Sequence, residues 1–315
     1  MIFTKARSVV AMTLAMIALS FVEASPIPSN SNVKAYIPVR ERVYTAEQLA
    51  GHEKLAKRSS SGLNDWNCKP SASHPYPLIL VHGLLANSWD NWIYMGPRFA
   101  IAGYCTFALT YGQMPGIPLF AGLDKMENSA VELSAFVDKV LAATNSTKVD
   151  FVGHSEGSLM PRYYLKNLGG APKVRKYGAF GAIAYGTTLD GLYPFLDSLG
   201  LYDPIQNIID PVCLSCFEFL EGSPFLNALN AGGDTVPGVE YKFVVSKMDE
   251  VVTPYTNGEL RTVSPLVSNV VLQNLCAVDL SDHVLQMVDP IVFHEMDAFL
   301  NPQVDQTVNC LSALD

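Results

Sequence analysis

The sequence is short of basic residues and of metal-binding patterns. It has 21 Lys and Arg against 30 Asp and Glu in 315 residues. Residues 1–58 hold eight of the basic but only four of the acidic residues, so residues 59–315 carry a net charge of −13. This charge repels nucleic acid and anionic membranes, and we expect neither as a partner. Cys213 and Cys216 have C-x-x-C spacing, but no second C-x-x-C or H-x-x-x-H accompanies them, which argues against a metal site.

The sequence also lacks internal repeats, and after residue 58 it has no apolar run long enough to span a membrane. The N-terminus differs from the rest. Lys5 and Arg7 precede the apolar run "SVVAMTLAMIALSFV", and small residues lead up to Ala24. This pattern predicts a secretory signal peptide over residues 1–24. A membrane anchor is the alternative, but the apolar run is shorter than the roughly 20 residues that a span needs.

Residues 25–58 are rich in Pro, Ser and charge and end in the dibasic pair Lys57-Arg58. In a secreted precursor this pair resembles a pro-peptide processing site, whereas the alternative is an ordinary pair of surface charges. We therefore expect a secreted, extracellular chain of residues 59–315 that forms one α/β domain, with a core that this length can bury.

Six cysteines lie in this part of the chain, and an even number in a secreted protein suggests disulfides. Six cysteines allow fifteen pairings. Cys68 lies just before the first expected strand and Cys105 lies inside the second. Cys276 ends a late expected strand and Cys310 lies near the C-terminus, which leaves Cys213 and Cys216 to pair locally. We predict the bridges Cys68–Cys105, Cys276–Cys310 and, as the local remaining pair, Cys213–Cys216. The sequon Asn145-Ser146-Thr147 predicts glycosylation of Asn145.

Short apolar runs alternate with helical patterns along the chain. Strands are expected at "PLILVHG" (77–83), "YCTFALTYG" (104–112), "KVDFV" (148–152), "YGAFGAIAYGT", "YKFVVSKM" and "VSNVVLQNL". Helices are expected at residues 129–144, with Ser129 and Glu132 as a capping box, at "SLMPRYYLKNL" and at residues 290–300. The alternation predicts a mainly parallel central sheet covered by helices on both faces.

One serine stands in an abrupt turn between a strand and a helix. Gly153-His154-Ser155-Glu156-Gly157 follows the apolar run that ends at Val152. G-x-S-x-G in this context is the nucleophile elbow, whose glycines permit a turn too tight for side chains. Ser155 is therefore the predicted nucleophile, with His154 as a spacer in the elbow.

A serine nucleophile needs a base, and the base needs an acid that orients it. Only His283 and His294 follow Ser155. His283 lies in a loop after an expected strand and is the predicted base, whereas His294 lies within the last helix. Asp249 directly follows "YKFVVSKM" and is the predicted acid, with Glu250 as the alternative. Asp282, adjacent to the base, and Asp234, which no strand precedes, fit this role less well.

The oxyanion that forms when a serine attacks a carbonyl carbon needs two backbone N–H donors. We expect one from Glu156, which follows the nucleophile, and one from Leu84 in the loop after "LILVHG". His82 precedes the serine, which is the wrong order for a base in this arrangement. We interpret His82 as a structural residue that braces this loop.

The stretches "PLILVHGLLANSWDNW", "GYCTFALTYG", "VDFVGHSEGSLMPRYYLKNLGG" and "DEVVTPY" together resemble the class 2 lipases. These are secreted lipases and esterases of actinobacteria and fungi in the α/β-hydrolase superfamily. The resemblance implies the α/β-hydrolase fold, ester hydrolysis through an acyl-enzyme, no cofactor, and the same site residues. Glu156 departs from the pattern, since such lipases often carry glutamine or methionine there.

About fifty residues separate "AYGTTLDG" from "YKFVVSKM", which is too many for a plain connection. Residues 190–236 are rich in apolar side chains. We expect a helical cap there that lines the acyl pocket with Phe195 and Leu199; an extra helical layer that completes the core is the alternative. The sequence thus predicts a triacylglycerol lipase that acts on lipid or small-molecule esters, with transient contact to lipid interfaces and no stable partner. A small-ester carboxylesterase, a cutinase-like polyester hydrolase, a serine peptidase and an inactive binding protein are the alternatives.

Overall fold

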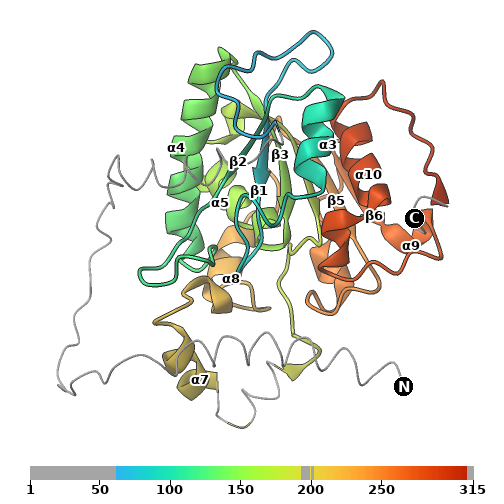
Figure 1. Ribbon diagram of the computed structural model, residues 1–315. Helices are drawn as coiled ribbons and strands as arrows, with labels where there is room; N and C mark the ends of the chain where they lie inside the picture. Colours follow the sequence, from blue (N-terminus) through green and yellow to red (C-terminus); the bar gives the residue numbers. More distant parts are fainter. Residues whose placement is uncertain (1–61, 193–198, 200–201, 311–315) are drawn as a thin grey trace. The chain divides into compact units, whose positions relative to one another are not determined.

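A six-stranded parallel sheet forms the centre of the protein (Figure 1). The computed structural model describes residues 62–192, 199 and 202–310, so the expected signal peptide and pro-peptide lie outside the described residues. The strands follow one another in space in the order β2-β1-β3-β4-β5-β6, and each neighbouring pair is parallel. Their bounds are β1 Leu78–Val81, β2 Thr106–Leu109, β3 Val149–His154, β4 Val174–Phe180, β5 Glu240–Val245 and β6 Val267–Val271. The predicted α/β-hydrolase architecture is confirmed.

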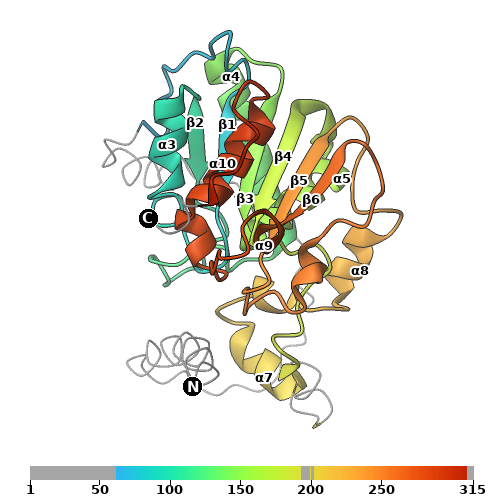
Figure 2. The ribbon, with the colours of Figure 1, turned by 90° about the vertical axis from the view of Figure 1, so that its right-hand side faces the viewer.

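Helices cover both faces of the sheet, and for this reason β1 and β3 are buried along their whole length. Successive side chains of a strand point to opposite faces. In β1, Ile79 and Val81 pack in one core cluster and Leu78 and Leu80 in the other. Figures 1 and 2 show α4 on the first face and α3 and α10 on the second. The helix bounds are α3 Met95–Ala102, α4 Met126–Thr144, α5 Met160–Asn167, α9 Leu272–Leu275 and α10 Pro290–Leu300.

Some element boundaries differ from the sequence prediction. Helix α4 begins at Met126, and Ser129 is buried inside it rather than capping it. The Glu218 carboxylate accepts a hydrogen bond from the Met126 N–H at 2.8 Å, so a distant residue stabilises this helix start. The last strand ends at Val271, and its apolar run continues as the short helix α9. Short apolar runs do not distinguish strand from helix by periodicity alone.

The insertion between β4 and β5 contains α7 (Tyr202–Ile209), a 3₁₀ helix (Ser215–Phe217) and α8 (Pro224–Asn230). It is helical, as expected, but part of it belongs to the core. Three apolar side chains of α8 are buried in the core cluster on the α4 face: Phe225, Leu226 and Leu229. Leu199 is 56% exposed, and Phe195 lies outside the described residues.

Three disulfides cross-link the described chain, in the pairs expected from the sequence. Cys68–Cys105 joins the segment before β1 to the residue directly before β2, and Cys276–Cys310 holds the C-terminal segment against the end of α9. Cys213–Cys216 closes a tight turn in the insertion. Cys105 thus precedes its strand rather than lying inside it. Within the described part of the chain, no helix combines the length and apolar character needed to cross a membrane.

Candidate active site

Ser155 lies at the carboxyl end of β3, where the strand turns into a 3₁₀ helix (Ser155–Ser158). Its φ of 54° is left-handed, which costs a non-glycine residue about 1–2 kcal/mol. A Cβ at Gly153 would stand 1.9 Å from the Gly157 carbonyl oxygen, and one at Gly157 would stand 2.1 Å from the Val81 carbonyl oxygen. Only glycine fits at either position, which explains the G-x-S-x-G pattern.

Three residues predicted from the sequence meet at this turn. His283 Nε2 lies 2.8 Å from Ser155 Oγ, and His283 Nδ1 lies 2.8 Å from Asp249 Oδ2. A carboxylate only accepts hydrogen bonds, so Nδ1–H donates to Asp249 and the unprotonated Nε2 of a neutral imidazole accepts the Ser155 hydroxyl hydrogen. All three side chains are more than 90% buried. The arrangement has the geometry of a nucleophile, a base and an orienting acid.

The acid and the base shift each other's pKa. Burial alone would raise the pKa of Asp249, but the adjacent His283 and the backbone N–H groups of Val251 and Val252 outweigh it and lower this pKa. Burial likewise works to lower the pKa of His283. The Asp249 carboxylate more than offsets this effect, so the pKa of His283 is raised. Asp249 therefore stays ionised, and its negative charge favours the protonated form of the His283 ring.

The alternatives considered from the sequence have other partners. Glu250 accepts a hydrogen bond from the backbone N–H of His283 at 3.2 Å rather than from its ring. Asp282 accepts from backbone N–H groups of its own loop, and Asp234 binds Thr262. His294 lies half-buried within α10. Of the two histidines that follow Ser155, His283 is the one that the structure places against it.

The loop that follows β1 packs directly on the elbow. A Cβ at Gly83 would stand 2.9 Å from Ser155 Cβ, and the next residue is Leu84. Leu85 N–H donates to the Ala121 carbonyl at 2.9 Å, which holds this loop in place. Glu156 is the second residue of its 3₁₀ helix, and N–H groups of a first helical turn have no acceptor within the helix. Leu84 and Glu156, the two expected oxyanion donors, thus lie on the loop and the turn that flank Ser155.

His82 stabilises the loop that follows β1, the structural role predicted from the sequence. Its Nδ1–H donates to the Gly83 carbonyl at 2.8 Å, and its Nε2 accepts from the Tyr111 N–H at 3.2 Å. Both ring nitrogens are therefore occupied by the backbone. Burial lowers the pKa of His82 to about 4, so the ring is neutral at pH 7. This histidine has no contact that would make it a base for Ser155.

Sequence reasoning missed a chain of polar contacts that connects the loop after β1 with His283. Asn91 Oδ1 accepts the Gly83 N–H at 3.0 Å and lies 2.9 Å from His154 Nδ1. His154 Nε2 in turn lies 3.2 Å from the His283 carbonyl oxygen. His154 is thus more than a spacer. Its contacts are 63 and 129 residues away in sequence, and no local pattern signals them.

Gln286 is a second residue that the sequence did not reveal. Its side-chain N–H donates to Asp249 Oδ2 at 3.3 Å, and its side-chain oxygen accepts the Gly181 N–H at 2.9 Å. Gln286 is fully buried. It therefore supports the carboxylate that faces His283 and ties it to the end of β4.

Exposed apolar side chains accumulate in the loops that follow the carboxyl ends of the strands, at the same edge of the sheet as Ser155. We call this set the apolar rim. It consists of Trp89, Ile93, Leu119, Phe120, Leu192, Leu199, Met248, Leu280, Val284 and Leu285. Exposed apolar side chains in this number on one edge of a protein are typical of a binding surface.

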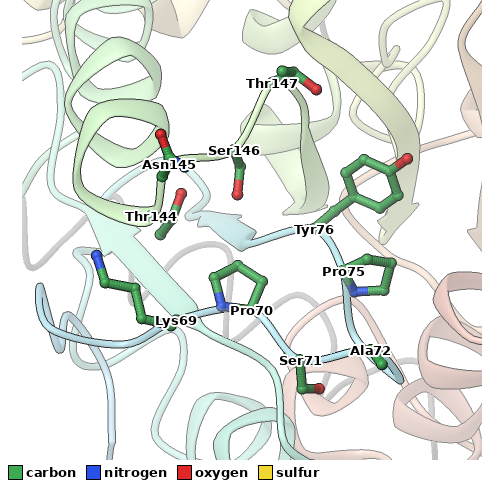
Figure 3. A pocket seen from close by; sticks show the side chains of 10 residues that line it. All are labelled: Lys69, Pro70, Ser71, Ala72, Pro75, Tyr76, Thr144, Asn145, Ser146 and Thr147. Carbon is green, nitrogen blue, oxygen red and sulfur yellow. The ribbon is translucent and has the colours of Figure 1, made fainter.

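A surface hollow of about 630 Å³ lies at the opposite edge of the sheet (Figure 3). Residues 69–72, 75–76 and 144–147 line it, shortly before β1 and β3 begin. Asn145 of the sequon is among these residues and is exposed. Because the hollow faces the amino ends of the strands, it is separate from the site at Ser155.

Comparison with known proteins agrees with this description. Two triacylglycerol lipases, from Pseudarthrobacter phenanthrenivorans and Burkholderia plantarii, are each 37% identical to this chain over 97 residues. The match covers 29% of this chain, 28% of the first relative and 25% of the second. This chain therefore spans about a quarter of the length of these relatives.

Two solved structures share the fold. Aspergillus fumigatus lipase B has a TM-score of 0.56 at 19% identity, with 88% of this chain and 62% of that chain covered. Mature Bacillus licheniformis lipase BlEst2 has a TM-score of 0.53 at 17% identity, with 74% and 94% covered. The sequence itself matches the family "Lipase (class 2)" over residues 75–287, a segment that holds the Ser155 elbow, Asp249 and His283. This chain therefore belongs to the class 2 lipase family.

Proposed function

We propose that this protein is a secreted triacylglycerol lipase that cleaves esters through an acyl-enzyme. Ser155 Oγ attacks the ester carbonyl carbon while its proton passes to His283 Nε2. His283 then gives this proton to the leaving alcohol oxygen as the bond between carbonyl carbon and alcohol oxygen breaks. Water next attacks the acyl-enzyme with His283 as base, which releases the fatty acid and returns the proton to Ser155. Asp249 holds the imidazole and stabilises its charged form.

The observation that carries this proposal is the pair of 2.8 Å contacts from His283 to Ser155 Oγ and to Asp249. The family membership supports the same chemistry. The first experiment is hydrolysis of p-nitrophenyl butyrate by the wild type and by Ser155→Ala. Loss of several orders of magnitude in kcat is expected for the variant. Wild-type activity in Ser155→Ala would refute the proposal.

The apolar rim supports a lipid over a small water-soluble ester as substrate. Its exposed side chains lie in loops at the same edge of the sheet as the buried Ser155. Each CH₂ group of an acyl chain that they cover contributes about 0.8 kcal/mol. A small-ester carboxylesterase is the second candidate. It is favoured by α8, which fills the core with Phe225, Leu226 and Leu229 and so adds stability rather than an acyl pocket.

An acyl-chain series separates the two candidates. For a lipase, kcat/KM for p-nitrophenyl esters rises from two carbons to medium or long chains. Leu199→Asp should reduce activity on long chains more than on short ones, because it places a charge in the rim. Ile101→Asp is the matched control: Ile101 is 86% exposed but lies at the end of α3, at the opposite edge of the sheet. A maximum of kcat/KM at the two-carbon ester would favour the carboxylesterase, provided that Leu199→Asp and Ile101→Asp also affect long and short chains to the same extent.

Secretion and processing complete the proposal. Three disulfides persist in an oxidising compartment, which supports an extracellular location. We expect removal of residues 1–24 and cleavage after Lys57-Arg58, and a glycan on the exposed Asn145. N-terminal sequencing of the secreted protein tests both cleavages. A mass shift on enzymatic deglycosylation that is absent in Asn145→Gln tests the glycan.

A further inference from the structure

The side chain of Glu156 has an unusual environment. It extends from the residue after Ser155 and is fully buried. Neither of its carboxyl oxygens forms a hydrogen bond of ordinary geometry with another described residue. Its polar neighbours are the hydroxyl groups of Ser215, in the turn closed by Cys213–Cys216, and of Tyr111, after β2. A buried ionised carboxylate would require donors at this place.

The hydrogens of both hydroxyl groups are already used. Ser215 Oγ donates to the Gly122 carbonyl at 2.5 Å, and Tyr111 OH donates to the His82 carbonyl at 2.6 Å. A carbonyl oxygen only accepts, so each hydroxyl hydrogen must point towards it. The two hydroxyl groups therefore present lone pairs, not hydrogens, to Glu156. A protonated carboxyl group matches lone pairs because it donates a hydrogen, whereas a carboxylate does not.

The burial of Glu156 and the charge nearest to it also favour the protonated form of its carboxyl group. Burial raises the pKa of Glu156 well above the ordinary value, and Glu218, in the insertion, raises it further; together they outweigh the opposite effect of the Ser215 and Tyr111 hydroxyl groups. Glu218 itself faces Glu127 and, more weakly, Lys125 at the start of α4. Tyr111 is neutral, because burial raises its pKa well above the ordinary value. Among the described residues, the groups that shift the pKa of Glu156 include no cation.

Residues 121–123, next to Glu156, connect the insertion to the loop that holds Leu84. Leu214 N–H donates to the Leu123 carbonyl at 2.7 Å, and Leu85 N–H donates to the Ala121 carbonyl at 2.9 Å. Residues 121–123 thus bind the Cys213–Cys216 turn on one side and the loop of Leu84 on the other. A Cβ at Gly122 would stand 3.2 Å from Leu84 Cα and 3.4 Å from Glu156 Oε1, so Gly122 separates the two.

We propose that Glu156 is a positioning residue for ester hydrolysis that acts as a neutral carboxylic acid. Its carboxyl hydrogen binds a lone pair of the Ser215 or Tyr111 hydroxyl and so ties the elbow to the layer that holds Leu84. The N–H groups of Leu84 and Glu156 then stay directed at the position of the oxyanion, and no negative charge stands beside it. This inference rests on the proposed function, in which these two N–H groups form the oxyanion hole.

The protonation of Glu156 is testable without any substrate. Urea unfolding of the wild type and of Glu156→Gln is compared from pH 5.5 to 8.5. The unfolded glutamate ionises above about pH 4.3, whereas the buried one stays neutral. The unfolding equilibrium constant of the wild type should therefore grow about tenfold per pH unit relative to that of the glutamine variant. If the ratio of the wild-type unfolding constant to that of Glu156→Gln did not change with pH, Glu156 would be ionised in the folded protein. That result would overturn the proposal.

The positioning role is tested with kcat and KM for p-nitrophenyl butyrate at pH 7.5. Glu156→Leu keeps the side-chain volume but forms no hydrogen bond. We expect its kcat to fall at least tenfold and its KM to stay within about twofold of the wild type. The reason is that losing one oxyanion donor lowers kcat by about 10²–10³. Glu156→Gln should recover most of this loss, because its amide still donates a hydrogen. Wild-type kcat in the leucine variant, or a glutamine variant no better than leucine, would refute the role. A wild type without esterase activity would instead refute the proposed function, while the urea measurement would still stand.

Discussion

Replacing Asp249 by asparagine should disable His283 without removing it. Asp249 Oδ1 accepts the backbone N–H groups of Val251 and Val252 at 3.0 and 2.7 Å. In the variant, the amide oxygen must occupy this position, because the NH₂ group would meet two donors there. The NH₂ group then takes the place of Oδ2, 2.8 Å from His283 Nδ1. It donates to Nδ1, and the remaining imidazole hydrogen moves to Nε2.

A histidine that is protonated at Nε2 cannot accept the Ser155 hydroxyl hydrogen. In serine hydrolases with this geometry, the wrong tautomer costs about 10⁴ in kcat, equivalent to about 5 kcal/mol of transition-state stabilisation. We therefore expect Asp249→Asn to lower kcat for p-nitrophenyl butyrate about 10⁴-fold at pH 7.5. The thermal unfolding midpoint is measured in parallel, so that loss of folded protein is not mistaken for loss of catalysis.

Two neighbouring carboxylates are the matched controls. Glu250 accepts from the His283 backbone N–H, and Asp282 accepts from backbone N–H groups of its own loop. The amide oxygens of Glu250→Gln and Asp282→Asn preserve these contacts, so each should retain kcat within about tenfold of the wild type. The reasoning is refuted if either control loses as much activity as Asp249→Asn, or if Asp249→Asn keeps more than a tenth of wild-type kcat.

Three further predictions concern pH, the elbow and a disulfide. Since the pKa of His283 is raised and only its neutral form is a base, kcat/KM should increase with pH through an inflection above about 6.5; an inflection below that value would contradict the Asp249 contact. Gly157→Ala should yield little active enzyme, because its Cβ would stand 2.1 Å from a carbonyl oxygen, and near-normal kcat would disprove this. The disulfide Cys68–Cys105 closes a loop with a sequence separation of 37 and so reduces the entropy of the unfolded chain. Removing it should lower the free energy of unfolding, measured in urea, by about 4 kcal/mol. A loss below about 1 kcal/mol would argue against this entropic explanation.

Long-range contacts decided the details that sequence reasoning did not find. The start of α4 at Met126 depends on Glu218, 92 residues later, and a capping box at Ser129 was the wrong local interpretation. The link from Asn91 through His154 to the backbone of His283 joins loops 63 and 129 residues apart. Hydrogen bonds between side chains so far apart leave no periodic or spacing pattern in the sequence, because only the folded sheet brings their loops to one edge.

The sequence by itself determined the features that depend on neighbouring residues. Alternating apolar runs and helical patterns predicted a parallel sheet with helices on both faces, because strand and helix periodicities are local properties. The glycines around Ser155 identified the elbow, because a turn this tight excludes every other residue. Only the tertiary structure decided that the carboxyl group of Glu156 lies between two hydroxyl groups whose hydrogens point elsewhere. Its burial results from packing between the insertion and the elbow, and sequence alone carries no measure of that packing.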